Sequence, residues 1–252
     1  MTPDGEAGTD EPARLLHSDL VFNLRDLGGY LGAGGRTIRW RTVLRGDGIH
    51  RLPASDLTAM GVRTVLDLRT ASEISERGRA EAPALHWYHL PMLRTIWAPE
   101  WFTDGMTPGR FLADRYLVML DEGAESLATA LRVLANSRAM PAVFHCAAGK
   151  DRTGVVASVL LSLLGVDDDT IAGDYHLSSA GMDRMVDFIR RTYPERYEVM
   201  ADQPPVFLDA PAEAMALFLA DIRTRWGSVD AYAASIGAGP DVVAALRANL
   251  LR

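Results

Sequence analysis

The sequence predicts an α/β fold with a mostly parallel central sheet between layers of helices. Short apolar strand segments alternate with helical segments along the first half of the chain, an order typical of a parallel sheet with right-handed crossovers. The apolar segment 141–145 is followed by a tight loop and by a helix that is apolar on nearly every side, which indicates a buried helix. We therefore expect three layers, with a sheet of about four to five strands and extra helices at the C-terminal end.

Length and composition favour one domain. The chain has 252 residues, of which 48% are hydrophobic and 23% are charged, as in an ordinary globular domain with a sizeable core. Residues 1–12 are rich in Gly, Pro, Asp and Glu, so we expect a disordered tail there. The single domain is expected over residues 13–252.

Charge and hydropathy exclude several classes of partner. The net charge is −7 and basic residues form no block, which argues against nucleic acid. The longest apolar run, within 155–164, is about ten residues long, whereas a bilayer span needs about 20. The polar, acidic start shows no secretory signal, and the single cysteine excludes a disulfide framework. We expect a soluble cytoplasmic protein.

Apolar alternation and turn residues place the first elements. Strands are expected at 37–45, 62–69, 85–90 and 141–145. A short helix is expected over 53–61, where Gly61 closes it. Thr70 and Glu73 have the spacing of a capping box, so the next helix begins after Thr70.

The stretch 91–110 interrupts this rhythm. It contains two Trp and a Phe but no periodic pattern. A long irregular stretch in a compact domain is often a lid or a binding loop. The alternative is an ordered flap whose aromatic side chains fill the core.

Apolar residues at helical spacing predict helices for most of the remaining chain. These are expected over 111–135, from about Arg152 to Leu164, from Asp167 toward Tyr175, around 182–189, around 215–222, from Gly227 to Gly237 and from Pro240 to Leu251.

The loop between the strand 141–145 and the following helix holds the only cysteine, Cys146. The backbone N–H groups of a helix's first turn have no partner within the helix and attract anions. A thiol at such a position, near cations, loses its proton more easily than a free thiol. The loop therefore suits both an anion and a thiolate.

Two basic residues follow the cysteine. Lys150 is the only lysine of the chain, and Arg152 lies six residues after Cys146. A lysine supplies a compact charge, whereas the planar guanidinium of an arginine can grip two oxygens of a phosphate. We expect the loop to wrap around a tetrahedral anion.

The string His145-Cys-Ala-Ala-Gly-Lys-Asp-Arg-Thr-Gly154 resembles the loop of the cysteine-dependent protein-tyrosine-phosphatase superfamily, which reads His-Cys-x5-Arg-Ser/Thr. Its particular form is similar to the bacterial tyrosine and phosphoinositide (triple-specificity) branch. The resemblance extends from about residue 13 to the end of the chain and implies a protein-tyrosine-phosphatase-like fold.

The N-terminal part carries a second, weaker resemblance to the same branch. The string Asn23-Leu-Arg-Asp-Leu-Gly-Gly-Tyr30 and the sequence Arg45-Gly-Asp47 are both similar to it, although that branch more usually has Ser where Gly46 stands. The resemblance implies supporting roles for Arg25 and Asp26. Taken from the residues alone, these two form a structural ion pair.

The resemblance implies hydrolysis of a phosphate monoester through a phosphocysteine. Cys146 is then the nucleophile, and Arg152 and the loop amides hold the phosphate oxygens. The expected phosphate-binding residues are Ala147, Ala148, Gly149, Lys150 and Thr153. Thr153 would also donate its hydroxyl to the sulfur, while His145 is expected to orient the loop.

Many members of the superfamily that the loop resembles carry the proton donor to the leaving group in a Trp-Pro-Asp string on a separate movable loop, and no such string occurs in this sequence. Asp151 lies inside the loop, where a carboxylate would repel the substrate, and the resemblance implies that it is the general acid. The alternative role for Asp151 is a helix N-cap. Asp104, in the irregular stretch, is the alternative acid.

We expect an enzyme that acts on phosphotyrosine or other phosphoproteins, with phosphoinositides as a further substrate class. A phospho-ligand binding module with little turnover is the alternative, and a sulfur-transfer or arsenate-reducing enzyme is a third reading. No cofactor or metal is expected, because the six histidines are scattered without ligand spacing.

Overall fold

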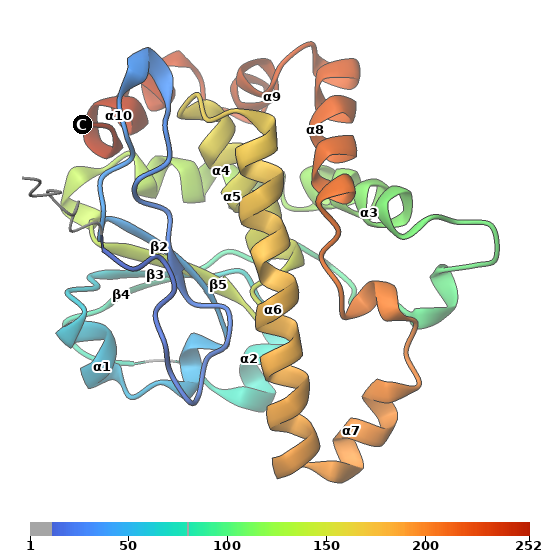
Figure 1. Cartoon of the computed structure of the whole chain (residues 1–252). Coiled ribbons are helices and arrows are strands. Elements are labelled where there is room, and N and C mark those ends of the chain that lie inside the picture. Colours follow the sequence, from blue (N-terminus) through green and yellow to red (C-terminus); the bar gives the residue numbers. More distant parts are fainter. Residues whose placement is uncertain (1–11, 80) are drawn as a thin grey trace, which may run out of the picture.

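The computed structural model describes residues 12–79 and 81–252 (Figure 1). The predicted tail over residues 1–12 lies outside the described residues except for Pro12.

A five-stranded sheet forms the centre of the structure, in the order β1-β2-β5-β3-β4. The strands are β1 (Arg25–Asp26), β2 (Val43–Asp47), β3 (Thr64–Asp67), β4 (His86–His89) and β5 (Ala142–Cys146). Only the short edge strand β1 is antiparallel to its neighbour, β2, and all other pairs are parallel. The predicted mostly parallel α/β sheet is confirmed.

The strand register brings three strand ends to the same level. Cys146 at the end of β5 pairs with Asp47 of β2, and His145 pairs with Asp67 of β3. In an open parallel sheet the loops after such ends meet at one edge. The loop after β5 therefore lies beside the segments that follow β2 and β3.

Helices cover both faces of the sheet (Figure 1). They are α1 (Ala54–Ala59), α2 (Ala71–Arg77), α3 (Pro108–Glu122), α4 (Ala124–Leu134), α5 (Asp151–Leu163), α6 (Asp168–Thr192), α7 (Pro194–Ala201), α8 (Ala212–Trp226), α9 (Val229–Ser235) and α10 (Pro240–Leu250).

Two separate cores show why three layers form. Successive strand residues face opposite sides, so Val65 packs in a small core with Leu57 of α1. Its neighbour Leu66 packs in the large core that the C-terminal helices share. The predicted layering and the extra C-terminal helices are confirmed.

The helix after the loop is almost entirely buried, as its sequence predicted. Eleven of the 13 residues of α5 are buried, because α5 contacts β5 and β2 on one side and α3, α4, α6, α9 and α10 around it. The loop that precedes it is thereby attached to a helix that is enclosed by the sheet and by five other helices.

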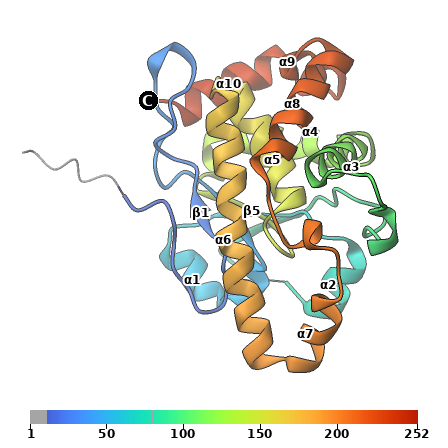
Figure 2. The ribbon, with the colours of Figure 1, turned by 45° about the vertical axis from the view of Figure 1, so that its right-hand side comes forward.

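Two predicted helices, from Asp167 and around 182–189, are a single 25-residue helix, α6. The small residues between them do not interrupt it. A Cβ atom on Gly181 would lie 3.0 Å from the Phe22 carbonyl oxygen and from Asn23, so the glycine permits close packing of α6 against the N-terminal segment. Figures 1 and 2 show α6 as one long helix beside the strands, followed by α7.

The predicted strand 37–45 is wrong in its first half. Thr37 and Ile38 form only isolated bridges, with Leu31 and Leu251, and β2 begins at Val43. Arg41 has a φ of 55°, which ends an extended run. Its N–H donates to the buried Asp26 carboxylate at 2.6 Å, so a tertiary contact fixes this turn.

The stretch 91–110 is irregular as far as Thr107, apart from one short turn over Pro99–Trp101. Its aromatic residues divide between two environments. Trp97 and Phe102 pack against the large core, whereas Trp101 is 41% exposed. The flap is thus partly core-bound, and its role as a lid stays a prediction.

Among the described helices, none combines the length and the apolar character needed to cross a membrane.

Candidate active site

The loop from Cys146 to Arg152, here called the phosphate loop, connects the end of β5 to the first turn of α5. Gly149 has a φ of +66°, and a Cβ on it would lie 2.7 Å from backbone atoms of Gly46 and Asp47. Only glycine fits such a position. Its N–H donates to the Cys146 sulfur at 3.2 Å, so the tight turn aims an amide at the thiol.

The other loop amides are available to an anion. The N–H groups of Ala147, Ala148 and Lys150 donate to no protein group in the described part of the chain. The first turn of α5 begins beside them, without a side-chain cap. Unpaired amides and the positive end of a helix dipole both favour a bound anion, and anion binding by this loop stays a prediction.

Arg152 is held by Glu73, which lies in the first turn of α2. The two form a bidentate pair in which one nitrogen–oxygen distance is 2.9 Å. Glu73 also completes the predicted capping box with Thr70, so its side chain is fixed from two sides. A guanidinium has five N–H donors, and Glu73 takes two of them.

Charges at this pair keep both partners ionised. Burial opposes ionisation of Glu73, but the hydrogen bonds and charge of Arg152 outweigh it and lower the pKa of Glu73 from 4.5 to about 2. Burial also opposes ionisation of Arg152, yet Cys146, Glu73 and Asp151 raise the pKa of Arg152 above its ordinary value. Arg152 is therefore a fixed cation beside the sulfur.

A second group of charges lies beneath the phosphate loop. This inner charge cluster consists of Arg25, Arg45 and Asp174. The two arginines share the Asp174 carboxylate at 3.0 and 2.6 Å, and all three side chains are at most 1% exposed. Arg45 also donates to the Gly149 carbonyl at 2.9 Å. The cluster thus connects β1, β2 and α6 to the backbone of the phosphate loop.

The cluster contains more positive than negative charge. Burial lowers the pKa of Arg45 to about 10, so it stays protonated at neutral pH. Burial disfavours the Asp174 carboxylate, but the two arginines hold the pKa of Asp174 well below its ordinary value. Two cations and one anion therefore leave a net positive charge under the loop.

Arg25 and Asp26 do not pair with each other, so the ion-pair interpretation is wrong. Adjacent strand residues face opposite ways. Arg25 points to Asp174, whereas Asp26 accepts the N–H groups of Gly28 and Arg41 at 2.8 and 2.6 Å. Asp26 therefore supports a turn rather than the loop.

The N-terminal segment also contacts the loop directly. Asn23 donates its side-chain amide to the Ala148 carbonyl at 3.1 Å. The buried Asp47 carboxylate accepts the N–H groups of Phe22 and Asn23 at 2.9 and 2.8 Å. The segments around residues 23 and 47 are thus hydrogen-bonded to each other, and Asn23 connects them to the phosphate loop.

His145 is buried near the end of β5, directly before the phosphate loop. Its Nδ1 lies 3.3 Å from the Cys146 carbonyl oxygen and its Nε2 lies 3.5 Å from Asp67. Burial lowers the pKa of His145 to about 4 although Asp67 opposes the shift. It is neutral at neutral pH, which is compatible with the orienting role that we expected.

Lys150 lies against protein oxygens. Its buried ammonium donates to the carbonyls of Val206 and Asp209 at 3.2 and 2.8 Å, and Asp151 lies 3.2 Å away. These contacts attach the phosphate loop to the segment before α8. Binding of phosphate by Lys150 stays a prediction.

Asp151 is the first residue of α5, and its carboxylate caps no backbone N–H. The alternative role as an N-cap is therefore wrong. Its Oδ1 accepts the Tyr116 hydroxyl at 2.7 Å, and the side chain is 24% exposed. An acid here lies within the phosphate loop and is partly exposed to solvent.

Asp104 lies outside the phosphate loop, and Thr153 makes a different contact from the predicted one. Asp104 is exposed in the irregular stretch. The Thr153 hydroxyl lies 3.5 Å from the Gly46 carbonyl, and the sulfur instead receives the Gly149 amide.

The sequence interpretation missed Glu73, Asp174, Tyr116 and Tyr175. The capping box marked Glu73 only as a helix start, and nothing in the sequence indicates that β3 neighbours β5. Tyr116 lies on α3, and Asp174 and Tyr175 lie on α6. No local motif distinguishes these three positions from other helix residues.

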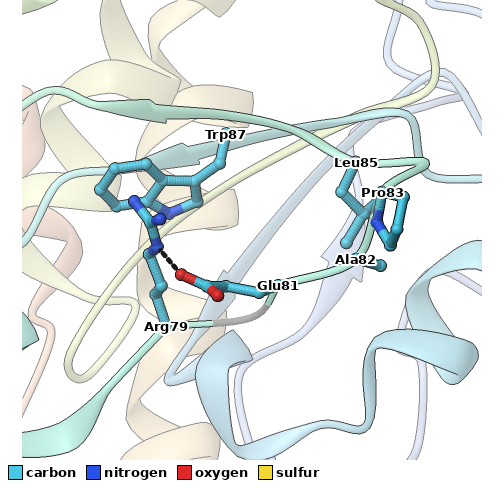
Figure 3. A pocket seen from close by; sticks show the side chains of 6 residues that line it. All are labelled: Arg79, Glu81, Ala82, Pro83, Leu85 and Trp87. Carbon is cyan, nitrogen blue, oxygen red and sulfur yellow. Dashed lines mark hydrogen bonds and ion pairs between the residues drawn. The ribbon is translucent and has the colours of Figure 1, made fainter.

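A hollow of about 500 Å³ lies away from these residues (Figure 3). It is lined by Arg79, Glu81, Ala82, Pro83, Leu85 and Trp87. Arg79 lies over the Trp87 ring at 4.2 Å and pairs with Glu81. It shares no residue with the phosphate loop. Within residues 12–79 and 81–252, no group of three or more His, Cys, Asp and Glu is arranged to hold a metal ion.

Known proteins are similar in sequence to this chain over most of its length. The family model described as "Tyrosine phosphatase family" matches residues 16–252. A candidate tyrosine-protein phosphatase of Cupriavidus necator is 31% identical over 86% of this chain and 82% of its own length. The triple specificity protein phosphatase PtpB of Mycobacterium tuberculosis is 26% identical over 92% of this chain and 97% of its own.

Among solved structures, the crystal structure of P. aeruginosa TpbA aligns with 66% of this chain and 91% of its own, at 15% identity and a TM-score of 0.32. The family match covers nearly the whole chain and includes the phosphate loop with its cysteine and arginine. The chain therefore belongs to the tyrosine phosphatase family.

Proposed function

We propose that this enzyme hydrolyses phosphate monoesters in two steps, with Cys146 as the nucleophile. One observation carries the assignment. The Cys146 sulfur lies at the end of β5 and accepts the N–H of Gly149. Arg152 lies in the first turn of the following helix, α5, where Glu73 of α2 holds its side chain. A nucleophile and a fixed cation thus lie on the same short loop.

In the first step the Cys146 thiolate attacks phosphorus, and a sulfur–phosphorus bond forms as the bond to the leaving oxygen breaks. The unpaired loop amides and Arg152 hold the other phosphate oxygens, on which charge must be stabilised. Asp151 gives its proton to the leaving oxygen. The alcohol or phenol departs, and a phosphocysteine remains.

In the second step a water molecule attacks phosphorus and passes a proton to Asp151. The sulfur–phosphorus bond breaks, which releases inorganic phosphate and restores the thiolate. The inner charge cluster supports both steps, because its net positive charge favours negative charge above it.

We propose phosphotyrosine in proteins as the main substrate class. The family description and the name of the Cupriavidus relative support it. The triple specificity of the Mycobacterium relative supports tests of other phosphoproteins and of phosphoinositides.

The decisive experiment measures turnover of phosphotyrosine peptide, phosphoserine peptide and phosphoinositide by the wild-type chain and by Cys146→Ser. We expect Cys146→Ser to lose about 10⁴-fold or more in kcat on every substrate, because a hydroxyl is a far weaker nucleophile. Circular dichroism spectra of the two proteins should coincide. Turnover that survives the substitution contradicts the proposal.

Two matched variants, Asp151→Asn and Asp104→Asn, identify the acid. Removal of a general acid costs about 10²- to 10⁴-fold for poor leaving groups and little for good ones. We expect that pattern for Asp151→Asn and no change for the exposed Asp104→Asn. The reverse result transfers the role to Asp104.

A further inference from the structure

Two buried tyrosines form a chain of hydrogen bonds that ends at the candidate acid, Asp151. Tyr116 comes from α3 and Tyr175 from α6, and both are at most 1% exposed. Their hydroxyl oxygens lie 2.5 Å apart, and the Tyr116 hydroxyl lies 2.7 Å from Oδ1 of Asp151. Tyr116 thus contacts the carboxylate directly, and Tyr175 reaches it only through Tyr116.

The direction of this hydrogen-bond chain follows from burial. Burial raises the pKa of Tyr116 and Tyr175 well above 10, so both phenols keep their protons. Tyr116 has one proton to donate and gives it to Asp151. Tyr175 must then donate to the Tyr116 oxygen.

A glycine of the loop motif makes room for this arrangement. A Cβ on Gly154 would lie 3.0 and 3.2 Å from two ring carbons of Tyr175, which is tight for a packed core. The glycine at the end of the motif therefore lets the Tyr175 ring pack directly on α5, one turn from Asp151.

The two oxygens of Asp151 are used differently. Oδ1 receives the Tyr116 hydroxyl at 2.7 Å and lies 3.2 Å from the Lys150 ammonium. Oδ2 has no hydrogen-bond partner among the residues that the structure describes. A carboxyl whose one oxygen accepts a hydroxyl and lies beside an ammonium carries its proton on the other oxygen.

We propose that Tyr116, fixed by Tyr175, is a positioning residue that orients the Asp151 carboxyl so that Oδ2 delivers the proton to the leaving oxygen. This proposal rests on the function proposed for Asp151. Tyr116 keeps its own proton throughout and acts only through Asp151. Its hydroxyl prevents rotation of the carboxyl, which would otherwise exchange the two oxygens.

The test compares Tyr116→Phe with the wild type on phenyl phosphate, a poor leaving group, and on 4-nitrophenyl phosphate, a good one. Misplacement of the acid affects only the substrate that needs a proton. We expect kcat to fall about 10-fold on phenyl phosphate and about 2-fold or less on 4-nitrophenyl phosphate, with KM unchanged.

Tyr232→Phe is the matched control. Tyr232 is also buried, and its hydroxyl donates to the Leu120 carbonyl of α3 at 2.9 Å. The same atom is removed from the same core, but away from Asp151. We expect an equal effect on both substrates, and a selective loss for Tyr232→Phe overturns the proposal.

Tyr175→Phe gives a second, milder variant that leaves the contact between Tyr116 and Asp151 in place. We expect a selective loss of about 3-fold, in the same direction. If neither tyrosine variant changes the ratio of the two kcat values, the proposal is wrong.

Asp151→Asn separates this proposal from the one on which it rests. If Asp151→Asn lowers kcat on phenyl phosphate selectively, the acid is assigned, and Tyr116→Phe added to it should cause no further selective loss. A further loss overturns the positioning role alone. If Asp151→Asn leaves the ratio unchanged, both assignments fail.

Discussion

Two groups of arginine–carboxylate contacts support the phosphate loop. They differ in burial and in how many hydrogen-bonding groups remain available to a ligand. In the inner charge cluster, two arginines share Asp174, and no side chain is more than 1% exposed. At the end of the phosphate loop, Arg152 pairs with Glu73 alone, and the two side chains are 9% and 12% exposed. The first group is completely buried, whereas the second is slightly exposed to solvent.

The difference separates support from chemistry. Asp174 is surrounded by Arg25, Arg45 and the Tyr30 hydroxyl, so its oxygens have no capacity for a ligand. Arg152 keeps about three of its five N–H donors after Glu73 has taken two. The spare donors of Arg152 suit a transient anion, whereas the Asp174 carboxylate, whose two oxygens already accept Arg25, Arg45 and Tyr30, suits a purely structural role.

Asp174→Asn should have the largest effect on stability. It leaves Arg25 and Arg45 buried without a compensating charge, which costs about 3–5 kcal/mol. Urea denaturation measures the loss. The control is Asp168→Asn, which breaks an exposed bidentate pair with Arg223 and should cost below about 1 kcal/mol. Equal losses would remove the distinction between sealed and exposed pairs.

Arg152→Lys should instead affect activity. A lysine keeps the charge but lacks the planar fork that can contact Glu73 and phosphate together. We expect kcat/KM to fall about 10²- to 10³-fold, or about 3–4 kcal/mol. The free energy of unfolding should fall by less than in Asp174→Asn, because the lysine keeps the positive charge that compensates Glu73. A large stability loss with unchanged kcat/KM would show that Arg152 belongs with the inner charge cluster.

Glu73→Gln should flatten the acid limb of the stability profile. The pKa of Glu73 is lowered from 4.5 to about 2, so its contribution to stability is complete above pH 4.5 and is lost as the pH falls toward 2. We expect the wild type to lose about 2 kcal/mol more than the variant across this window.

Thermal unfolding at several pH values between those limits measures this difference. Glu81→Gln, in an exposed pair with Arg79, is the control and should keep the wild-type slope. Parallel curves of stability against pH for the wild type and Glu73→Gln would contradict an ionised pair between Glu73 and Arg152.

Local patterns predicted what is encoded locally. The capping box at Thr70 formed because its two hydrogen bonds join residues three apart, and the helix after the loop is buried as its unbroken apolar run required. The strand 37–45 and the division of α6 were wrong because contacts with Asp26, Asn23 and Phe22 decided them. Those partners are distant in the sequence.

The sequence alone determined the α/β class, the order of most elements and the loop with its single cysteine, since each depends on periodicity or on residues within one short string. Only the tertiary structure decided that Arg152 pairs with Glu73, that Asp174 pairs with two arginines, and that Tyr116 contacts both Asp151 and Tyr175. Each of these contacts joins elements brought together by the strand order and by helix packing. A charge or a hydroxyl has no partner until that packing supplies one.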